Sequence, residues 1–221
     1  MRRLPNPELD RIILDALAVR YKLLEKREGI HLSSLVYCLT KGYFDLTSPI
    51  EPTDTELLLF ATGYGLQEVM FPSETVLYTH EGIIYRPDGT LQVSRQDMQT
   101  LIEIKSTRAG VKKYQEGNLP ETWLKYMMGG CKIRGLTSYD LGVIYLSERP
   151  VARIISETVY FEQEEIDNNW KWLTDRRDIY QRAIDTETAP TPYTTANEWM
   201  CNGCRYSTVC SALVMLGNRT G

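Results

Sequence analysis

The sequence predicts a single α/β or α+β domain built on one mixed β-sheet, with helices before, between and after the strands. The 221 residues, 43% hydrophobic and 24% charged, suit one globular domain with a substantial core. Apolar spacing typical of helices alternates along the chain with short runs of β-branched and aromatic residues. We expect residues 1–72 to form a helical N-terminal part, 73–184 the core with the sheet, and 185–221 a linker and a cysteine-bearing tail.

Capping signals and apolar periods define the expected helices. Asn6-Pro7-Glu8 is typical of a helix start, and the apolar period that follows ends at Gly29. Thr53 and Glu56 form a capping box ahead of an apolar run. The predicted helices cover 7–28, 32–44, a segment that begins at 53, 120–134 and 163–184.

The expected strands are short segments rich in β-branched or aromatic residues. They cover 74–78, 82–86, 100–106, 140–146 and 152–161. Residues 185–196 contain two prolines and five threonines, a composition typical of a linker.

Composition indicates a cytoplasmic protein with no membrane partner. The two N-terminal arginines precede no apolar segment, and no eighteen apolar residues run together. In a reducing compartment the five cysteines would remain thiols or bind metal. The net charge of −4 argues weakly against a nucleic-acid partner, but residues 101–135 hold seven basic and three acidic side chains. This local surplus suits either a phosphate-binding groove or a solvated helix face.

An alternating strand carries the first group of candidate residues. Between 101 and 105, Ile102 and Ile104 face one side of the sheet while Glu103 and Lys105 share the other. A half-exposed strand with an ion pair would also give this pattern. A hairpin from the preceding strand would bring Asp88 beside Glu103 and Lys105.

Two carboxylates in one pocket repel each other unless a divalent cation compensates, and their hard oxygens suit Mg²⁺ or Mn²⁺. Such a metal can activate water and neutralise a phosphoryl oxygen, while a lysine stabilises the developing negative charge. The residues therefore indicate phosphodiester hydrolysis. The alternative for Asp88 is a simple turn, because Pro-Asp-Gly is a common turn sequence.

The cysteines form the second group. Cys201, Cys204 and Cys210 lie close together in the polar tail, as expected of ligands to a soft metal centre. The fourth ligand could be Cys38 or Cys131. Zinc sites more often pair two Cys-x2-Cys units, so the spacing favours an iron–sulfur cluster over zinc.

Taken in order along the chain, these motifs resemble iron–sulfur RecB-like nucleases of the PD-(D/E)XK superfamily. The sequence is most similar to the CRISPR-associated exonuclease and its phage-borne relatives, and the resemblance spans residues 30–210. It implies a restriction-endonuclease-like core. The motifs that carry it are 31–38, 82–88, 103–108 and the set Cys201, Cys204 and Cys210.

The resemblance implies a role for each matching residue at the catalytic metal, Mg²⁺ or Mn²⁺. Asp88 and Glu103 would be metal-binding acids, His31 would join them, and the backbone carbonyl of Ile104 would be a further ligand. Lys105 would be the catalytic lysine. For His31 the alternative is a surface or capping histidine ahead of a helix.

For the cysteines the resemblance implies a structural cluster, 4Fe-4S ahead of 2Fe-2S or zinc. Cys38 would be its distant first ligand, and Cys201, Cys204 and Cys210 would supply the others. The cluster would tie the C-terminal tail to the helix after His31. Cys131 would be a thiol buried in the helix that starts at Pro120.

The implied activity is an exonuclease acting on single-stranded DNA or single-stranded ends. Its setting would be CRISPR adaptation, with CRISPR integrase proteins as partners, or phage DNA processing. The sequence departs from the family in the stretch 122–131, which does not supply both the expected glutamine and tyrosine, although Tyr126 could substitute in part. The alternative is a non-catalytic, zinc-bound module for DNA binding or complex assembly.

Overall fold

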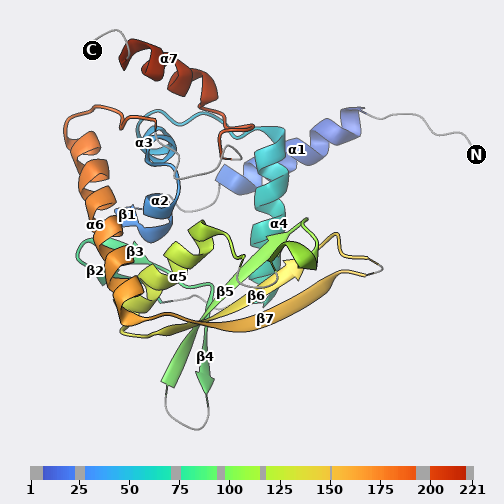
Figure 1. The fold of residues 1–221 in the computed structure, drawn as a ribbon. Coiled ribbons are helices and arrows are strands. Elements are labelled where there is room, and N and C mark those ends of the chain that lie inside the picture. The colour runs from blue at the N-terminus through green and yellow to red at the C-terminus, as the bar shows by residue number, and fades with distance from the viewer. Residues whose placement is uncertain are drawn as a thin grey trace, which may run out of the picture.

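The computed structural model describes residues 7–22, 28–70, 76–93, 98–114, 118–149, 151–192 and 200–217 (Figure 1). None of the described helices is both long and apolar enough to cross a membrane. The elements are α1 (Pro7–Lys22), β1 (Ile30–His31), α2 (Leu32–Val36), α3 (Leu39–Thr47), α4 (Asp54–Met70), β2 (Tyr78–His80), β3 (Ile83–Tyr85), β4 (Gly89–Val93), β5 (Met98–Thr107), a 3-10 turn (Val111–Tyr114), α5 (Glu121–Arg134), β6 (Ser138–Tyr145), β7 (Arg153–Tyr160), α6 (Gln163–Asp185) and α7 (Ser207–Gly217).

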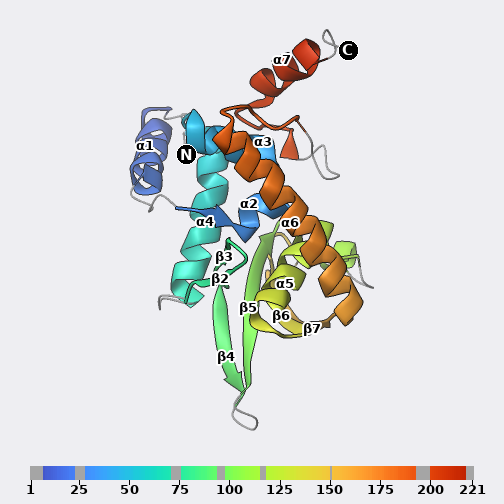
Figure 2. The ribbon, with the colours of Figure 1, turned by 90° about the vertical axis from the view of Figure 1, so that its left-hand side faces the viewer.

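The predicted mixed α/β class is confirmed, but the expected single sheet is wrong, because the strands are divided between two sheets. The larger sheet has the order β4-β5-β6-β7, and the smaller has the order β1-β3-β2. Strands β5 and β6 are parallel, as expected for strands joined through helix α5, while β4 and β7 pair antiparallel at the two edges. The β4–β5 hairpin projects from the helices at the end of the molecule opposite α7 (Figures 1 and 2).

One face of the larger sheet forms the centre of the core. Alternate residues of β6, including Tyr139 and Leu141, are buried there beside Leu101 and Glu103 of β5. Helix α5 packs on this face, and α6 packs against α5, α2 and α3. The two charged residues of β5 therefore lie on the covered side of the sheet.

Two adjacent glycines allow α5 to approach its neighbours closely. A Cβ at Gly129 would lie 2.7 Å from Leu32, and a Cβ at Gly130 would lie 2.8 Å from Tyr85. Glycine lowers helix stability by about 1 kcal/mol relative to alanine. At these positions the close packing requires it.

The helix predicted over 32–44 is wrong in one respect, because it is broken between α2 and α3. Tyr37 and Cys38 are both extended at the break. The buried guanidinium of Arg176, from α6, donates hydrogen bonds of 2.5 Å to the carbonyls of Leu35 and Tyr37. A partner 139 residues away in sequence thus satisfies carbonyls that a continuous helix would bond internally.

Other predicted helix and strand boundaries lie closer to the observed ones. The capping box of Thr53 and Glu56 is confirmed, because each backbone N–H donates to the other side chain. The strand predicted at 74–78 is observed at 78–80, with residues 71–75 outside the described part of the chain. Residues 23–27 of the predicted first helix also lie outside it. The prediction did not include β4 or α7.

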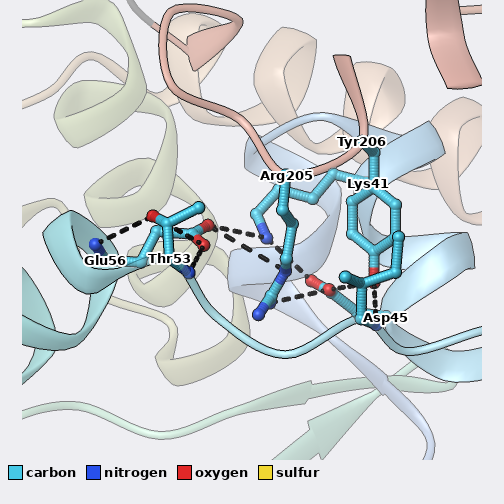
Figure 3. A network of polar contacts seen from close by, with 7 residues as sticks. Lys41, Asp45, Thr53, Glu56, Arg205 and Tyr206 are labelled. Carbon is cyan, nitrogen blue, oxygen red and sulfur yellow. Dashed lines mark hydrogen bonds and ion pairs between the residues drawn. The ribbon is translucent and has the colours of Figure 1, made fainter. Parts of the chain in front are cut away.

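The cysteine-bearing tail is fixed to α3 and the segment after it by a tail anchor, which we define as Lys41, Asp45, Glu56, Arg205 and Tyr206 (Figure 3). Arg205 and the Tyr206 hydroxyl both donate to Asp45, at 2.8 and 2.9 Å. The Tyr206 ring is buried and stacks on Phe44. These contacts fix the start of the described tail to α3.

Candidate functional site

The β4–β5 hairpin brings Asp88 to the charged residues of β5. Asp88 precedes β4, whose first residue pairs with Ile102. The Ile104 N–H donates a hydrogen bond of 2.8 Å to Asp88 Oδ2, which fixes the carboxylate beside the strand. The hairpin expected from the sequence is thus present, but its first strand is β4 and not the strand at 83–85.

Glu103 and Lys105 form an ion pair on the buried face of β5. Glu103 is only 2% exposed, and its burial is the main cause that raises its pKa to about 7. Burial alone would lower the pKa of Lys105, but the negative charges of Glu103 and Asp88 outweigh it and raise that pKa. Lys105 is therefore held as a cation.

Two tyrosines extend this group into the core. Tyr139, from β6, donates to Glu103 Oε2 over 3.5 Å, and its hydroxyl also pairs with that of Tyr85 from β3. The absence of a side chain at Gly130 makes room for both rings. The sequence interpretation missed these tyrosines because they come from different strands. Their only signal was a tyrosine at an apolar strand position.

Two further tyrosines lie around Lys105. The Tyr126 hydroxyl donates to the carbonyl of Arg86 over 2.8 Å, and Lys105 Nζ lies 5.6 Å from the centre of its ring. Burial is the main cause that raises the pKa of Tyr37, at the break after α2. The charge of Lys105 lowers this pKa, and the charge of Glu103 raises it. Arg176 holds the backbone of Tyr37 in this position.

The carboxylates have the chemistry that a divalent cation requires. Asp88 and Glu103 supply two negative charges beside a single ammonium group, so their hard oxygens would favour Mg²⁺ or Mn²⁺. Within the described ranges, no three or more His, Cys, Asp or Glu side chains stand ready to hold a metal ion. The metal-ligand roles of Asp88, Glu103 and the Ile104 carbonyl stay predictions.

His31 lies at the end of β1 in the smaller sheet. It pairs with Ile84 of β3, the strand that leads into Pro87 and Asp88. Its Nε2 is 3.1 Å from the carbonyl oxygen of Glu28. Its role as a further metal ligand also stays a prediction.

Cys38, Cys204 and Cys201 lie near enough to Cys210 to act on its pKa, but no three of these described thiols are arranged to hold a metal ion. Burial is the main cause that raises the pKa of Cys210 to about 11, and the charges of Cys38, Cys204 and Cys201 contribute in the same direction. Cys38 lies at the N-terminus of α3, to which the tail anchor fixes the tail. Their ligation of a cluster stays a prediction. Cys131 is fully buried in α5, as expected, and donates to the Ser138 carbonyl.

No known family model matches the chain, and no curated protein does. Among solved structures, the chain is similar to the crystal structure of SSO0001, with 17% identity over 93% of this chain and 97% of that one, at a TM-score of 0.55. An alkaline exonuclease from Laribacter hongkongensis (13% identity, 72% and 91% coverage, TM-score 0.47) and a phage-related exonuclease from Haemophilus somnus (11%, 74% and 98%, TM-score 0.45) are more distant. At these identities the similarity concerns the fold alone.

Proposed function

We propose that the chain is a metal-dependent deoxyribonuclease that hydrolyses phosphodiester bonds, as an exonuclease on single-stranded DNA ends. The observation that carries this proposal is the convergence of Asp88, Glu103 and Lys105 at the start of the β4–β5 hairpin. Two acids and a cation in this arrangement suit phosphoryl chemistry. The resemblance to RecB-like nucleases adds the expectation of a DNA substrate, in CRISPR adaptation or phage DNA processing.

The proposed chemistry divides among the residues of the site. Asp88, Glu103, the Ile104 carbonyl and His31 would hold Mg²⁺ or Mn²⁺, which would supply activation of water and charge neutralisation. Lys105 would stabilise negative charge on the phosphate. Tyr139 would hold the Glu103 carboxylate in position through its hydroxyl group.

The cysteine set would hold an iron–sulfur cluster with a structural role. Four thiols match the ligand number of a 4Fe-4S cluster, and the tail anchor fixes Arg205 and Tyr206, which follow Cys204, to α3, whose N-cap is Cys38. Iron and acid-labile sulfide in protein purified without oxygen would support this assignment. Zinc without iron would support the zinc-bound alternative, and catalysis would still need its own measurement.

Purified protein tests the proposed activity directly. With Mn²⁺ it should release nucleotides from a single-stranded oligonucleotide, and EDTA should stop the release because no metal then reaches Asp88 and Glu103. Asp88→Asn, prepared in the same way, controls for a contaminating nuclease and should lower the rate about 100-fold. Absence of hydrolysis with either Mn²⁺ or Mg²⁺ would overturn the proposal.

Gly130→Ala tests whether the tyrosine pair supports the site. The new Cβ would lie within 3 Å of Tyr85 and Tyr139, so we expect both rings to move and Glu103 to lose its position. Hydrolysis should fall about tenfold, with a net loss of about 1 to 2 kcal/mol in the free energy of unfolding. Nuclease rates and urea unfolding measure the two effects.

Gly129→Ala is the matched control, because its Cβ crowds Leu32 and Leu173 and not the tyrosines. It should lower the free energy of unfolding similarly while the folded protein keeps its rate. Equal rates for the two variants would contradict a supporting role for the tyrosine pair.

A further inference from the structure

A cleft of about 290 Å³ lies between helix α4 and the candidate active site. Asp88, Ile104, Lys105 and Ser106 form the wall on the β4–β5 side. The opposite wall is one face of α4, since its residues recur at helical spacing. These residues are Leu59, Phe60, Gly63, Tyr64, Leu66 and Gln67.

The two walls offer different chemistry to a ligand. The α4 wall is lined by two aromatic residues, Phe60 and Tyr64, and by Gln67, whereas the other wall holds the Lys105 cation beside the Asp88 carboxylate. Unpaired bases are recognised by stacking on aromatic side chains together with hydrogen bonds to their edges, and phosphates by cations. The volume lies near the lower end of small-molecule pockets, about 300 to 1,000 Å³. It therefore suits one unpaired nucleotide better than a length of duplex.

The α4 wall is held in place from behind. Helix α1 packs against α4, and the Tyr21 ring stacks on Phe60 with 5.1 Å between ring centres. At the end of α1, Arg20 forms an ion pair with Glu68 of α4, and Lys22 forms one with Glu51 in the segment before α4. A stacking surface that is fixed in advance loses less conformational entropy when a base binds.

We propose that this cleft binds the unpaired base of the DNA nucleotide next to the scissile phosphate, with α4 as the base-binding wall. The inference rests on the proposed function and specifies its substrate. Tyr64 stacks on the base, Gln67 hydrogen-bonds its edge, and the backbone phosphate lies toward Lys105. Such a site selects single-stranded ends because a paired base is not available to enter it.

Gly63 allows the cleft to be filled without disturbing the fold. A Cβ built at Gly63 meets no atom within 4 Å, so a larger side chain would extend into open space on the cleft wall. Gly65, on the same helix, also has no atom near its Cβ, but it lines a second hollow between α1 and α4, which shares only Phe60 and Tyr64 with the cleft. Gly63→Leu and Gly65→Leu are therefore a matched pair, and both should raise the thermal midpoint because leucine favours helix.

The test compares both variants on two substrates with Mn²⁺. For a single-stranded oligonucleotide, Gly63→Leu should raise KM about tenfold, the size expected for loss of base stacking, and Gly65→Leu should not. With the wild-type protein, an abasic terminal nucleotide in the substrate should raise KM by a similar factor. With this substrate, Gly63→Leu should raise KM no further.

Binding separates this inference from the proposed function. In EDTA, fluorescence anisotropy of a labelled single strand should show about tenfold weaker binding to Gly63→Leu than to Gly65→Leu. Equal binding and equal KM would overturn the inference while wild-type hydrolysis still supported the proposed function. Weaker binding to Gly63→Leu by a protein that hydrolyses neither substrate would support the cleft and overturn the nuclease proposal.

Discussion

Replacing Glu103 with glutamine is expected to lower the rate of DNA hydrolysis about 100- to 1,000-fold, the largest effect among the substitutions considered. Glutamine keeps the shape of the side chain but removes its charge, so it binds a divalent cation poorly and leaves Lys105 without its partner. The nuclease rate and the Mn²⁺ affinity, measured by calorimetry, should both fall.

The stability of the Glu103→Gln variant should fall as well. Removing one partner from a fully buried ion pair costs about 3 to 5 kcal/mol. The Lys105 side chain keeps 24% exposure, so we expect a smaller loss of about 1 to 3 kcal/mol in the free energy of unfolding. Activity must therefore be compared at temperatures where both proteins are folded.

Two further variants make the Glu103 result specific. Glu157→Gln is the same chemical change at an exposed position of the edge strand β7, where Glu157 pairs with Leu141, and it should alter neither rate nor stability appreciably. Lys105→Met should lower the rate but keep Mn²⁺ binding, because the lysine is not a metal ligand. A folded Glu103→Gln protein with an undiminished rate would contradict the proposed catalytic role.

Replacing Tyr206 with alanine is expected to release the C-terminal tail. The side chain is 1% exposed, stacks on Phe44, donates to Asp45 and accepts from the Ile50 N–H. Loss of a buried aromatic side chain lowers the free energy of unfolding by about 3 to 5 kcal/mol. Urea unfolding measures this loss, and limited proteolysis between the tail and α6 reports the release.

Tyr206→Phe is the conservative control. It keeps the stacked ring but leaves Ile50 N–H and Asp45 without the hydroxyl, so the expected loss is about 1 to 2 kcal/mol with the tail still in place. If the cysteines hold iron, the alanine variant should lose it while the phenylalanine variant keeps it. An alanine variant as stable and as protease-resistant as the wild type would show that the tail anchor does not hold the tail.

The glycine pair in α5 shows what a local rule leaves undecided. Gly129-Gly130 lowers helix propensity, yet the helix predicted over 120–134 is observed from Glu121 to Arg134. Each glycine is the point at which another element approaches, Leu32 of α2 at Gly129 and the tyrosine pair at Gly130. Packing therefore compensates for the low helix propensity, and the sequence contains no local sign of which neighbours would approach.

The sequence by itself determined those features whose causes lie within a few residues of one another. The capping box of Thr53 and Glu56 and the alternation that places Glu103 and Lys105 on one face of β5 both depend on near neighbours. The mixed α/β class follows from the sum of such local patterns.

Only the tertiary structure decided which distant residues meet. The break between α2 and α3 depends on Arg176 of α6. The Glu103 carboxylate contacts Tyr139 of β6, and the tail is fixed by Asp45 of α3. The base-binding wall proposed for α4 depends on the position of that helix beside Lys105. Such contacts form when the core closes, because buried polar groups must then find partners wherever the chain brings them.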